Sequence, residues 1–161
     1  MLTRRMALSS GLAAIAGVNL LQFEGARAAE EAHIVLTDAE WRSKLTADQY
    51  AVLRNEGTER PFTSPLLHEE RKGVFACAGC GLDLFSSSTK FDSGTGWPSF
   101  WAPLDNAVNT HVDKSYGMIR SAVTCHRCDG HLGHVFDDGP KPTGLRYCMN
   151  GLALTFKPAT A

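Results

Sequence analysis

Hydrophobic and polar positions predict two short helices at the start of the globular part of the chain. Residues 37–40 (TDAE) and 46–49 (TADQ) each place a threonine three residues before an acid or amide, which is the capping-box pattern of a helix N-terminus. Apolar residues at helical spacing follow these patterns, namely Trp41, Leu45, Tyr50 and Leu53. The sequence therefore predicts two helices, the second ending near Gly57.

From Gly73 onward the pattern changes to short runs of β-branched and aromatic residues, which glycine, proline, asparagine and aspartate interrupt. Such runs predict strands at residues 73–77, 100–102, 108–113, 118–124, 134–137, 145–150 and 152–157. The interpretation is a mainly antiparallel β domain with an N-terminal helical cover.

The first 28 residues have the pattern of an export signal. Arg4 and Arg5 precede a short apolar run from Ser9 to Leu21, and Ala26-Arg27-Ala28 has the small-x-small form of a cleavage site. Paired arginines indicate the twin-arginine route, which carries folded proteins. The alternative is an uncut membrane anchor, but the run is shorter than the ~18 to 20 apolar residues that span a bilayer. We expect cleavage after Ala28 and a periplasmic protein of residues 29–161 without stable membrane insertion.

Composition narrows the function classes of that mature chain. Residues 29–161 form a length typical of one domain, and they keep 13 basic and 16 acidic residues, a net charge near −3. No basic patch indicates a nucleic acid or an acidic membrane as partner. We expect a monomer that acts without nucleic acid.

Four of the five cysteines form two Cys-x-x-Cys pairs, Cys77/Cys80 and Cys125/Cys128, each followed by a glycine within two residues. This spacing is typical of a structural zinc site with four thiolate ligands and no open position. The alternative is two disulfides, which an oxidising compartment permits. A bridge within one pair would close only a tiny loop and restrain the chain little, so the pattern favours one structural zinc per chain.

The fifth cysteine, Cys148, has no partner in this scheme and is either a reactive thiol or a buried apolar side chain. Three features elsewhere bear on that choice. His131 and His134 are suited to proton transfer near neutral pH, Arg146 would lower a thiol pKa, and Trp97 would form the wall of an apolar pocket. Each also has a structural interpretation as a core or surface residue, and spacing alone does not choose between them.

Four motifs together make the chain similar to a known family. Residues 73–80 (GVFACAGC), 90–100 (KFDSGTGWPSF), 130–140 (GHLGHVFDDGP) and 146–150 (RYCMN) closely resemble methionine-R-sulfoxide reductase B, in the order of that family. The resemblance covers nearly all of residues 35–158. It implies a tent-like fold of two antiparallel β-sheets with short N-terminal helices, and a structural zinc remote from the reaction centre.

The resemblance also implies roles for individual residues. Cys148 would be the nucleophile, and His131, His134 and Asn150 would complete the catalytic group. Trp97 would hold the substrate methyl group, and Arg146 and Phe136 are expected on the substrate side of the site. The implied activity is that of a peptide-methionine (R)-S-oxide reductase that repairs oxidised proteins, with Cys148 passing through a sulfenic acid.

At one position the chain departs from the commonest family pattern. Many members have a resolving cysteine where this chain has Thr95, so we expect an external reductant, either thioredoxin-like or a small thiol. A zinc cysteine acting as the resolving thiol is the alternative, and it would release metal during turnover. Two other functions remain open from the sequence: a zinc-stabilised binding module without activity, which the missing cysteine favours, and a thiol peroxidase.

Overall fold

The computed structural model describes residues 33–160, so the expected export signal at residues 1–28 lies outside the described residues. Two helices come first, α1 (Asp38–Lys44) and α2 (Ala47–Asn55). Both predicted capping boxes are present: Thr37 and Thr46 each accept from the backbone N–H three residues on, and the side chain there accepts from the threonine N–H. No helix within residues 33–160 is both long and apolar enough to cross a bilayer.

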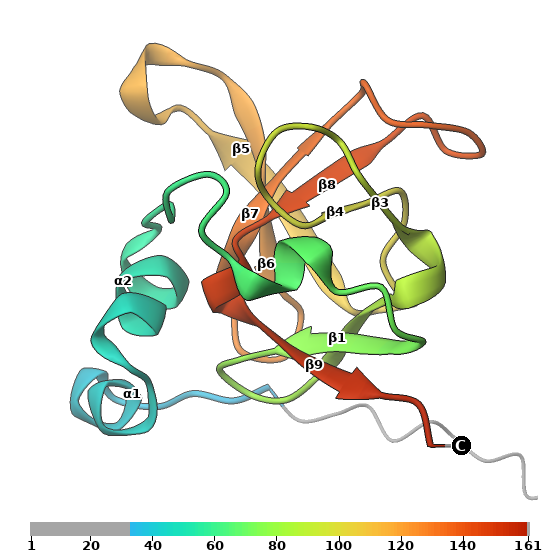
Figure 1. Ribbon diagram of the computed structural model, residues 1–161. Helices are drawn as coiled ribbons and strands as arrows, with labels where there is room; N and C mark the ends of the chain where they lie inside the picture. The colour runs from blue at the N-terminus through green and yellow to red at the C-terminus, as the bar shows by residue number, and fades with distance from the viewer. Residues whose placement is uncertain (1–32, 161) are drawn as a thin grey trace, which may run out of the picture. The chain divides into compact units, whose positions relative to one another are not determined.

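A three-stranded antiparallel sheet has the order β2-β1-β9 (Figure 1). Its strands are β1 (Gly73–Cys77), β2 (Asp83–Ser86) and β9 (Leu154–Pro158). The first and last strands of the domain thus pair with each other, with Phe75 opposite Phe156. The short 3-10 helices η1 (Pro65–His68) and η2 (Ser87–Thr89) connect neighbouring segments.

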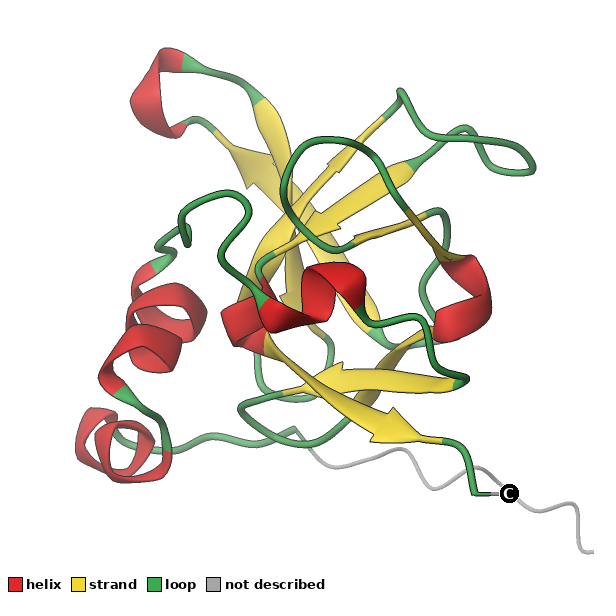
Figure 2. Cartoon of the chain, viewed as in Figure 1, coloured by secondary structure: helices red, strands yellow, loops and turns green. Residues whose placement is uncertain are grey.

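A six-stranded antiparallel sheet has the order β3-β4-β8-β7-β6-β5 (Figure 2). Its strands are β3 (Lys90–Phe91), β4 (Ser99–Phe100), β5 (Val108–Asp113), β6 (Arg120–Cys125), β7 (His131–Phe136) and β8 (Arg146–Met149). The 3-10 helices η3 (Ser115–Gly117) and η4 (Gly151–Ala153) complete the fold. The predicted fold class, mainly β with two antiparallel sheets and short N-terminal helices, is confirmed.

Several predicted strand ends were wrong, and the reasons are local. The strand expected at 118–124 begins at Arg120, because η3 with Tyr116 at positive φ turns the chain before it. The strand expected at 152–157 begins at Leu154, since η4 occupies residues 151–153. The strand expected at 134–137 already begins at His131. β2 and the two-residue β3 were not predicted.

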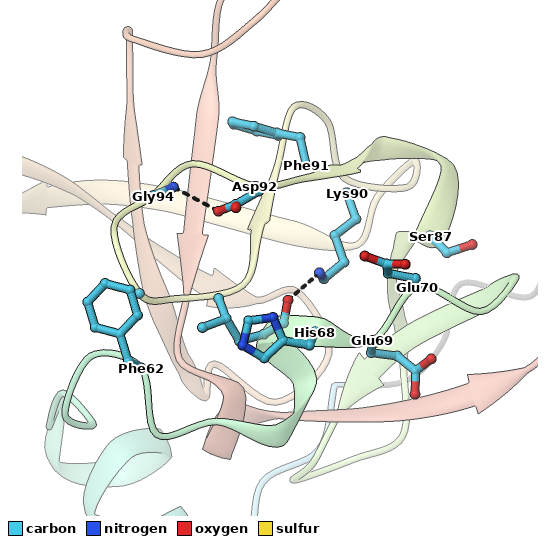
Figure 3. Close-up of a pocket in the computed structure, with 11 residues that line it drawn as sticks. Phe62, His68, Glu69, Glu70, Ser87, Lys90, Phe91, Asp92 and Gly94 are labelled. Carbon is cyan, nitrogen blue, oxygen red and sulfur yellow. Dashed lines mark hydrogen bonds between the residues drawn. The ribbon is translucent and has the colours of Figure 1, made fainter.

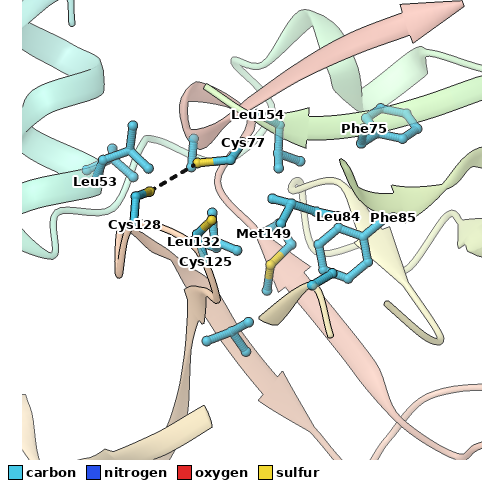
Figure 4. Packing of buried hydrophobic residues seen from close by; sticks show 14 of the residues in the cluster. Leu53, Phe75, Cys77, Leu84, Phe85, Cys125, Cys128, Leu132, Met149 and Leu154 are labelled. Carbon is cyan, nitrogen blue, oxygen red and sulfur yellow. Dashed lines mark hydrogen bonds between the residues drawn. The ribbon is translucent and has the colours of Figure 1, made fainter. Parts of the chain in front are cut away.

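The core lies where the two sheets and α2 meet. Figure 4 shows Phe75 and Leu154 of the small sheet with Met149 of the large sheet and Leu53 of α2. Phe85 stacks on Phe100 with ring centroids 4.4 Å apart, which joins β2 to β4. The core side of β8 is therefore fixed by Met149, which is fully buried, and the neighbouring Cys148 points to the other face of the large sheet.

Candidate active site

Cys148 lies in β8 at the centre of the large sheet. Its direct neighbours across the strands are Ser99 of β4 and His134 of β7. Residues directly opposite each other in an antiparallel pair project to the same face. The register thus brings together the thiol, a hydroxyl and an imidazole from segments that are far apart in the sequence.

A β-bulge in β7 adds His131 to this group. Side chains alternate along a regular strand, so two histidines three residues apart would point to opposite faces. The pairing is regular from Ala122 opposite His134 to Val123 opposite Gly133, but Thr124 lies opposite His131, which leaves Leu132 as the extra residue. As a result the two imidazole rings lie 5.3 Å apart between centroids. A Cβ at Gly133 would lie 2.1 Å from Cys148 O, so this bulge requires glycine.

His134 is held by an acidic partner that the sequence analysis missed. Asp113, the last residue of β5, lies with Oδ2 2.8 Å from His134 Nε2 and 2.6 Å from an Arg120 guanidinium nitrogen. Hydrogen bonds from Ser115 and the neighbouring His134 and Arg120 hold the pKa of Asp113 well below its usual range. An ionised carboxylate only accepts, so His134 Nε2 carries the proton in this bond. Burial lowers the pKa of His134, and the bond to Asp113 opposes that shift.

His131 is a buried, neutral histidine. Only 3% of its surface is exposed, and neither ring nitrogen has a hydrogen-bond partner among the described residues. Burial, with a smaller contribution from the positive charge of the neighbouring His134, lowers the pKa of His131 to about 4. A buried imidazole without a partner is available to bind a group that enters the site.

The environment of Cys148 favours the neutral thiol over the thiolate. Burial raises its pKa, whereas hydrogen bonds from Thr95 and Ser99 and the positive charge of Arg146 oppose the rise. The expectation that the pKa of Cys148 is lowered was therefore wrong for the free protein, because the loss of solvation outweighs the effect of Arg146. Thr95 Oγ1 lies 3.8 Å from Cys148 Sγ.

Cys148 and His134 lie at the wall of an open cavity of about 120 Å³. The cavity is lined by Thr58, Trp97, Arg120, Gly133, His134, Phe136, Cys148 and Asn150. Such a volume is much smaller than the ~300–1,000 Å³ of a pocket that encloses a whole small-molecule ligand. It suits the end of one side chain, with a thiol and an imidazole at its wall.

Comparison with known proteins identifies the family of this chain. Residues 45–158 match the SelR domain. The peptide methionine sulfoxide reductase MsrB of Pseudomonas putida (strain W619) is 59% identical over 120 residues, which are 74% of this chain and 90% of that protein. This chain belongs to the MsrB family of peptide methionine sulfoxide reductases.

Two further relatives with the same name agree. The MsrB of Agrobacterium fabrum (strain C58) is 54% identical over 123 residues, covering 76% of this chain and 91% of that protein. The MsrB of Bradyrhizobium diazoefficiens is 54% identical over 129 residues, with 78% and 91% covered.

The predicted site residues of this MsrB-family chain fall into two groups. Trp97, His134, Phe136, Cys148 and Asn150 line the cavity. His131 and Arg146 do not line it. The Arg146 guanidinium makes two hydrogen bonds of 2.8 Å to Asp138 and lies 4.4 Å from the centre of the Phe136 ring. Arg146 thus supports a wall of the cavity from behind and contributes positive charge near the thiol.

The four cysteines of the two Cys-x-x-Cys pairs form the predicted cluster. Their sulfurs all lie within 4.8 Å of one another, with 3.7 Å between Cys77 and Cys128 and 3.5 Å between Cys80 and Cys125. A disulfide has sulfurs about 2.05 Å apart, so these distances exclude the predicted alternative of two disulfides in this structure. Four sulfurs at the corners of a tetrahedron about 2.3 Å from a metal are roughly 3.8 Å apart, which the cluster fits.

A second cavity is larger but lacks the reactive thiol. It measures about 360 Å³ and is lined by charged residues, including Glu70, Lys90 and Asp92 (Figure 3). Lys90 Nζ donates to Leu67 O at 2.7 Å. Gly94 and Gly96 line this larger cavity, and Thr95 between them lies 3.8 Å from Cys148 Sγ. The larger cavity has no cysteine in its lining, so it is not the site of thiol chemistry.

Proposed function

We propose that this protein reduces methionine-R-sulfoxide in proteins to methionine, with Cys148 as nucleophile. The observation that carries this proposal is that Cys148, His134 and Trp97 line one small cavity in a member of the MsrB family. The cavity admits one side chain, which suits an oxidised methionine on a protein surface.

The positions of Cys148 and His134 support a reaction in which the thiol supplies the nucleophile and the imidazole supplies the proton. Cys148 Sγ attacks the sulfoxide sulfur, and the sulfoxide oxygen takes a proton from imidazolium His134. Because Asp113 holds Nε2, Nδ1 of His134 is the nitrogen that serves the substrate. The thiol proton returns to the imidazole, methionine leaves, and Cys148 keeps the oxygen as a sulfenic acid. Trp97 provides the apolar wall for the methyl group, so that only the R epimer directs its oxygen at the histidines.

An external thiol then restores the enzyme. One external thiol condenses with the sulfenic acid to form a mixed disulfide and water. A second external thiol then attacks the first one, which releases the Cys148 thiol and leaves the two external sulfurs joined as a disulfide. The replacement of the resolving cysteine by Thr95 supports this route. The reductant is thioredoxin-like or a small thiol. We further propose that the protein works in the periplasm as a monomer, after export of the folded chain and cleavage at Ala28.

The metal of the cysteine cluster is proposed to be zinc. Cys77, Cys80, Cys125 and Cys128 would hold it as thiolates, which leaves no open position for substrate. Its chemistry is therefore structural and takes no part in the reaction.

Reduction of a peptide that contains both epimers of methionine sulfoxide tests the proposal. With excess dithiothreitol, the R epimer alone should disappear, and Cys148→Ser should abolish the reaction. If neither epimer changed with a folded, metal-loaded sample, a binding module would be the better conclusion. Consumption of peroxide at a comparable rate, without any sulfoxide, would instead point to a thiol peroxidase.

A further inference from the structure

Glu59 is a buried acid that no step above uses. Only 8% of its surface is exposed, and it lies in the segment between α2 and η1. Its two carboxylate oxygens accept from Gly151 N at 2.6 Å and from Leu152 N at 2.9 Å. Hydrogen bonds to a charged acceptor are among the stronger ones in proteins. The side chain therefore fastens residue 59 to the chain directly after Asn150.

The backbone of Glu59 in turn holds two side chains of the candidate active site. Glu59 N donates to Asn150 Oδ1 at 3.0 Å, and Trp97 Nε1 donates to Glu59 O at 3.2 Å. Both Trp97 and Asn150 line the cavity that contains Cys148. The same cavity is lined by Thr58, the residue before Glu59. Glu59 is thus linked to three residues of the cavity wall, Thr58, Trp97 and Asn150.

The packing around the carboxylate leaves little freedom. A Cβ at Gly151 would lie 3.2 Å from Glu59 Oε1 and 1.8 Å from Ser64 Oγ. Asn150 is also tied on its other side, because Nδ2 donates to Leu132 O at 3.1 Å. A shift of Glu59 would therefore move the Trp97 indole while Asn150 stays linked to β7.

We propose that Glu59 is a positioning residue that sets the Trp97 indole against the substrate methyl group. This inference rests on the proposed reductase function and deepens it. Displacement of a reacting group by about 1 Å can cost on the order of 100-fold in rate, so a modest movement of this wall has a measurable effect. Since Trp97 contacts the substrate before and during the reaction, the loss falls mainly on KM.

Glu59→Gln is the first test. Glutamine has the same size, but its amide has one acceptor oxygen, whereas the N–H groups of Gly151 and Leu152 each need an acceptor. We expect KM for a peptide R-sulfoxide to rise about tenfold while kcat changes by less than about threefold. The indole N–H resonance of Trp97, identified by its absence in Trp97→Phe, should shift. In the Trp97→Phe background Glu59→Gln should add no further increase in KM, because coupled residues are not additive.

Thr89→Val is the matched control. Thr89 is also 8% exposed, and its hydroxyl donates to the carbonyls of Ser86 and Ala102 at 3.0 Å, outside the active site. It should lower the melting temperature without a change in KM. If Glu59→Gln does not fold, Glu59→Asp is judged by the same criteria, since its shorter side chain cannot reach both N–H groups unless residue 59 moves.

The outcomes separate this inference from the proposed function. A wild-type protein that does not reduce the R epimer would overturn the proposed function itself. An active wild type whose Glu59 variants lose only thermal stability, with KM within twofold of wild type, would overturn the role of Glu59 alone.

Discussion

Thr95 Oγ1 lies 3.8 Å from Cys148 Sγ, so the threonine hydroxyl is next to the thiol proposed as nucleophile. Thr95 also takes part in a chain of hydroxyl groups, with Ser93 Oγ 2.8 Å away and Ser99 Oγ 2.7 Å beyond that. The loop of residues 93–96 is therefore ordered against the thiol even though it carries no second sulfur.

Thr95→Cys should convert this chain to a two-cysteine enzyme. The flanking Gly94 and Gly96 have positive φ, and the loop needs to move a sulfur by only one to two ångströms to reach the bonding distance of about 2.05 Å. After one turnover without reductant, the sulfenic acid of wild type should react with dimedone, whereas the variant should form a disulfide and give no adduct. Ser88→Cys, at an exposed site, is the control. An equal dimedone adduct in Thr95→Cys would contradict this prediction.

The helices and the main strands were predictable because their signals are local. The capping threonines Thr37 and Thr46 act on residues three positions away, and β5 was predicted from the β-branched residues within its own six positions. β2 was not predictable in this way, since Leu84 and Phe85 are both fully buried and do not alternate. The 3-10 helix η4 depends on Glu59, more than 90 residues earlier in the chain.

The reactive residues of the site were predictable from the sequence, but the residues and backbone features that hold them in place were not. Cys148 and Trp97 were identified by motif and resemblance, and both line the cavity. Asp113 is 21 residues from His134, and its signal in the sequence is only that of an acid at a strand end. The bulge in β7 was also unpredicted, although Gly133 between the two histidines was a sign that regular alternation fails there.

Asp113→Asn should change the pH dependence of the reaction. The ionised Asp113 stabilises imidazolium His134, so its loss should lower the His134 pKa further and reduce the protonated fraction at neutral pH. We expect kcat/KM at pH 7 to fall about tenfold, and the decline of activity with rising pH to begin at lower pH. Asp83→Asn, which removes a surface ion pair with Lys157, is the control. An unchanged pH profile in Asp113→Asn would show that Asp113 does not act on His134.

His131 should make the fold sensitive to acid. Its pKa is about 4 in the folded chain and about 6.5 when unfolded, so the unfolded state binds more protons between these values. The free energy of unfolding therefore falls as pH decreases from about 6.5 to 4, by at most about 3 kcal/mol from this residue. His131→Asn should lose less stability than wild type over that range in urea unfolding. Equal losses in both proteins would assign the acid sensitivity to other groups.

Removal of metal should separate the two sheets. Cys77 ends β1 of the small sheet, and Cys80 follows in the next turn; Cys125 ends β6 of the large sheet, and Cys128 follows likewise. A bound metal therefore joins one hairpin of each sheet, beside the core residues Leu53 and Leu132 (Figure 4). Structural zinc contributes on the order of 10 kcal/mol in small zinc peptides, which is comparable to the whole stability of a domain.

We accordingly expect a strong chelator or Cys77→Ser to unfold the protein. Circular dichroism measures the unfolding, and metal analysis measures the metal content of the chain. Cys148→Ser provides the matched control, because it removes a sulfur from the same protein without touching the cluster; it should retain one metal per chain and the wild-type melting temperature. A metal-free Cys77→Ser protein that remained folded would show that packing of the hydrophobic core holds the two sheets together without metal. In that case the cysteine cluster would serve something other than the fold.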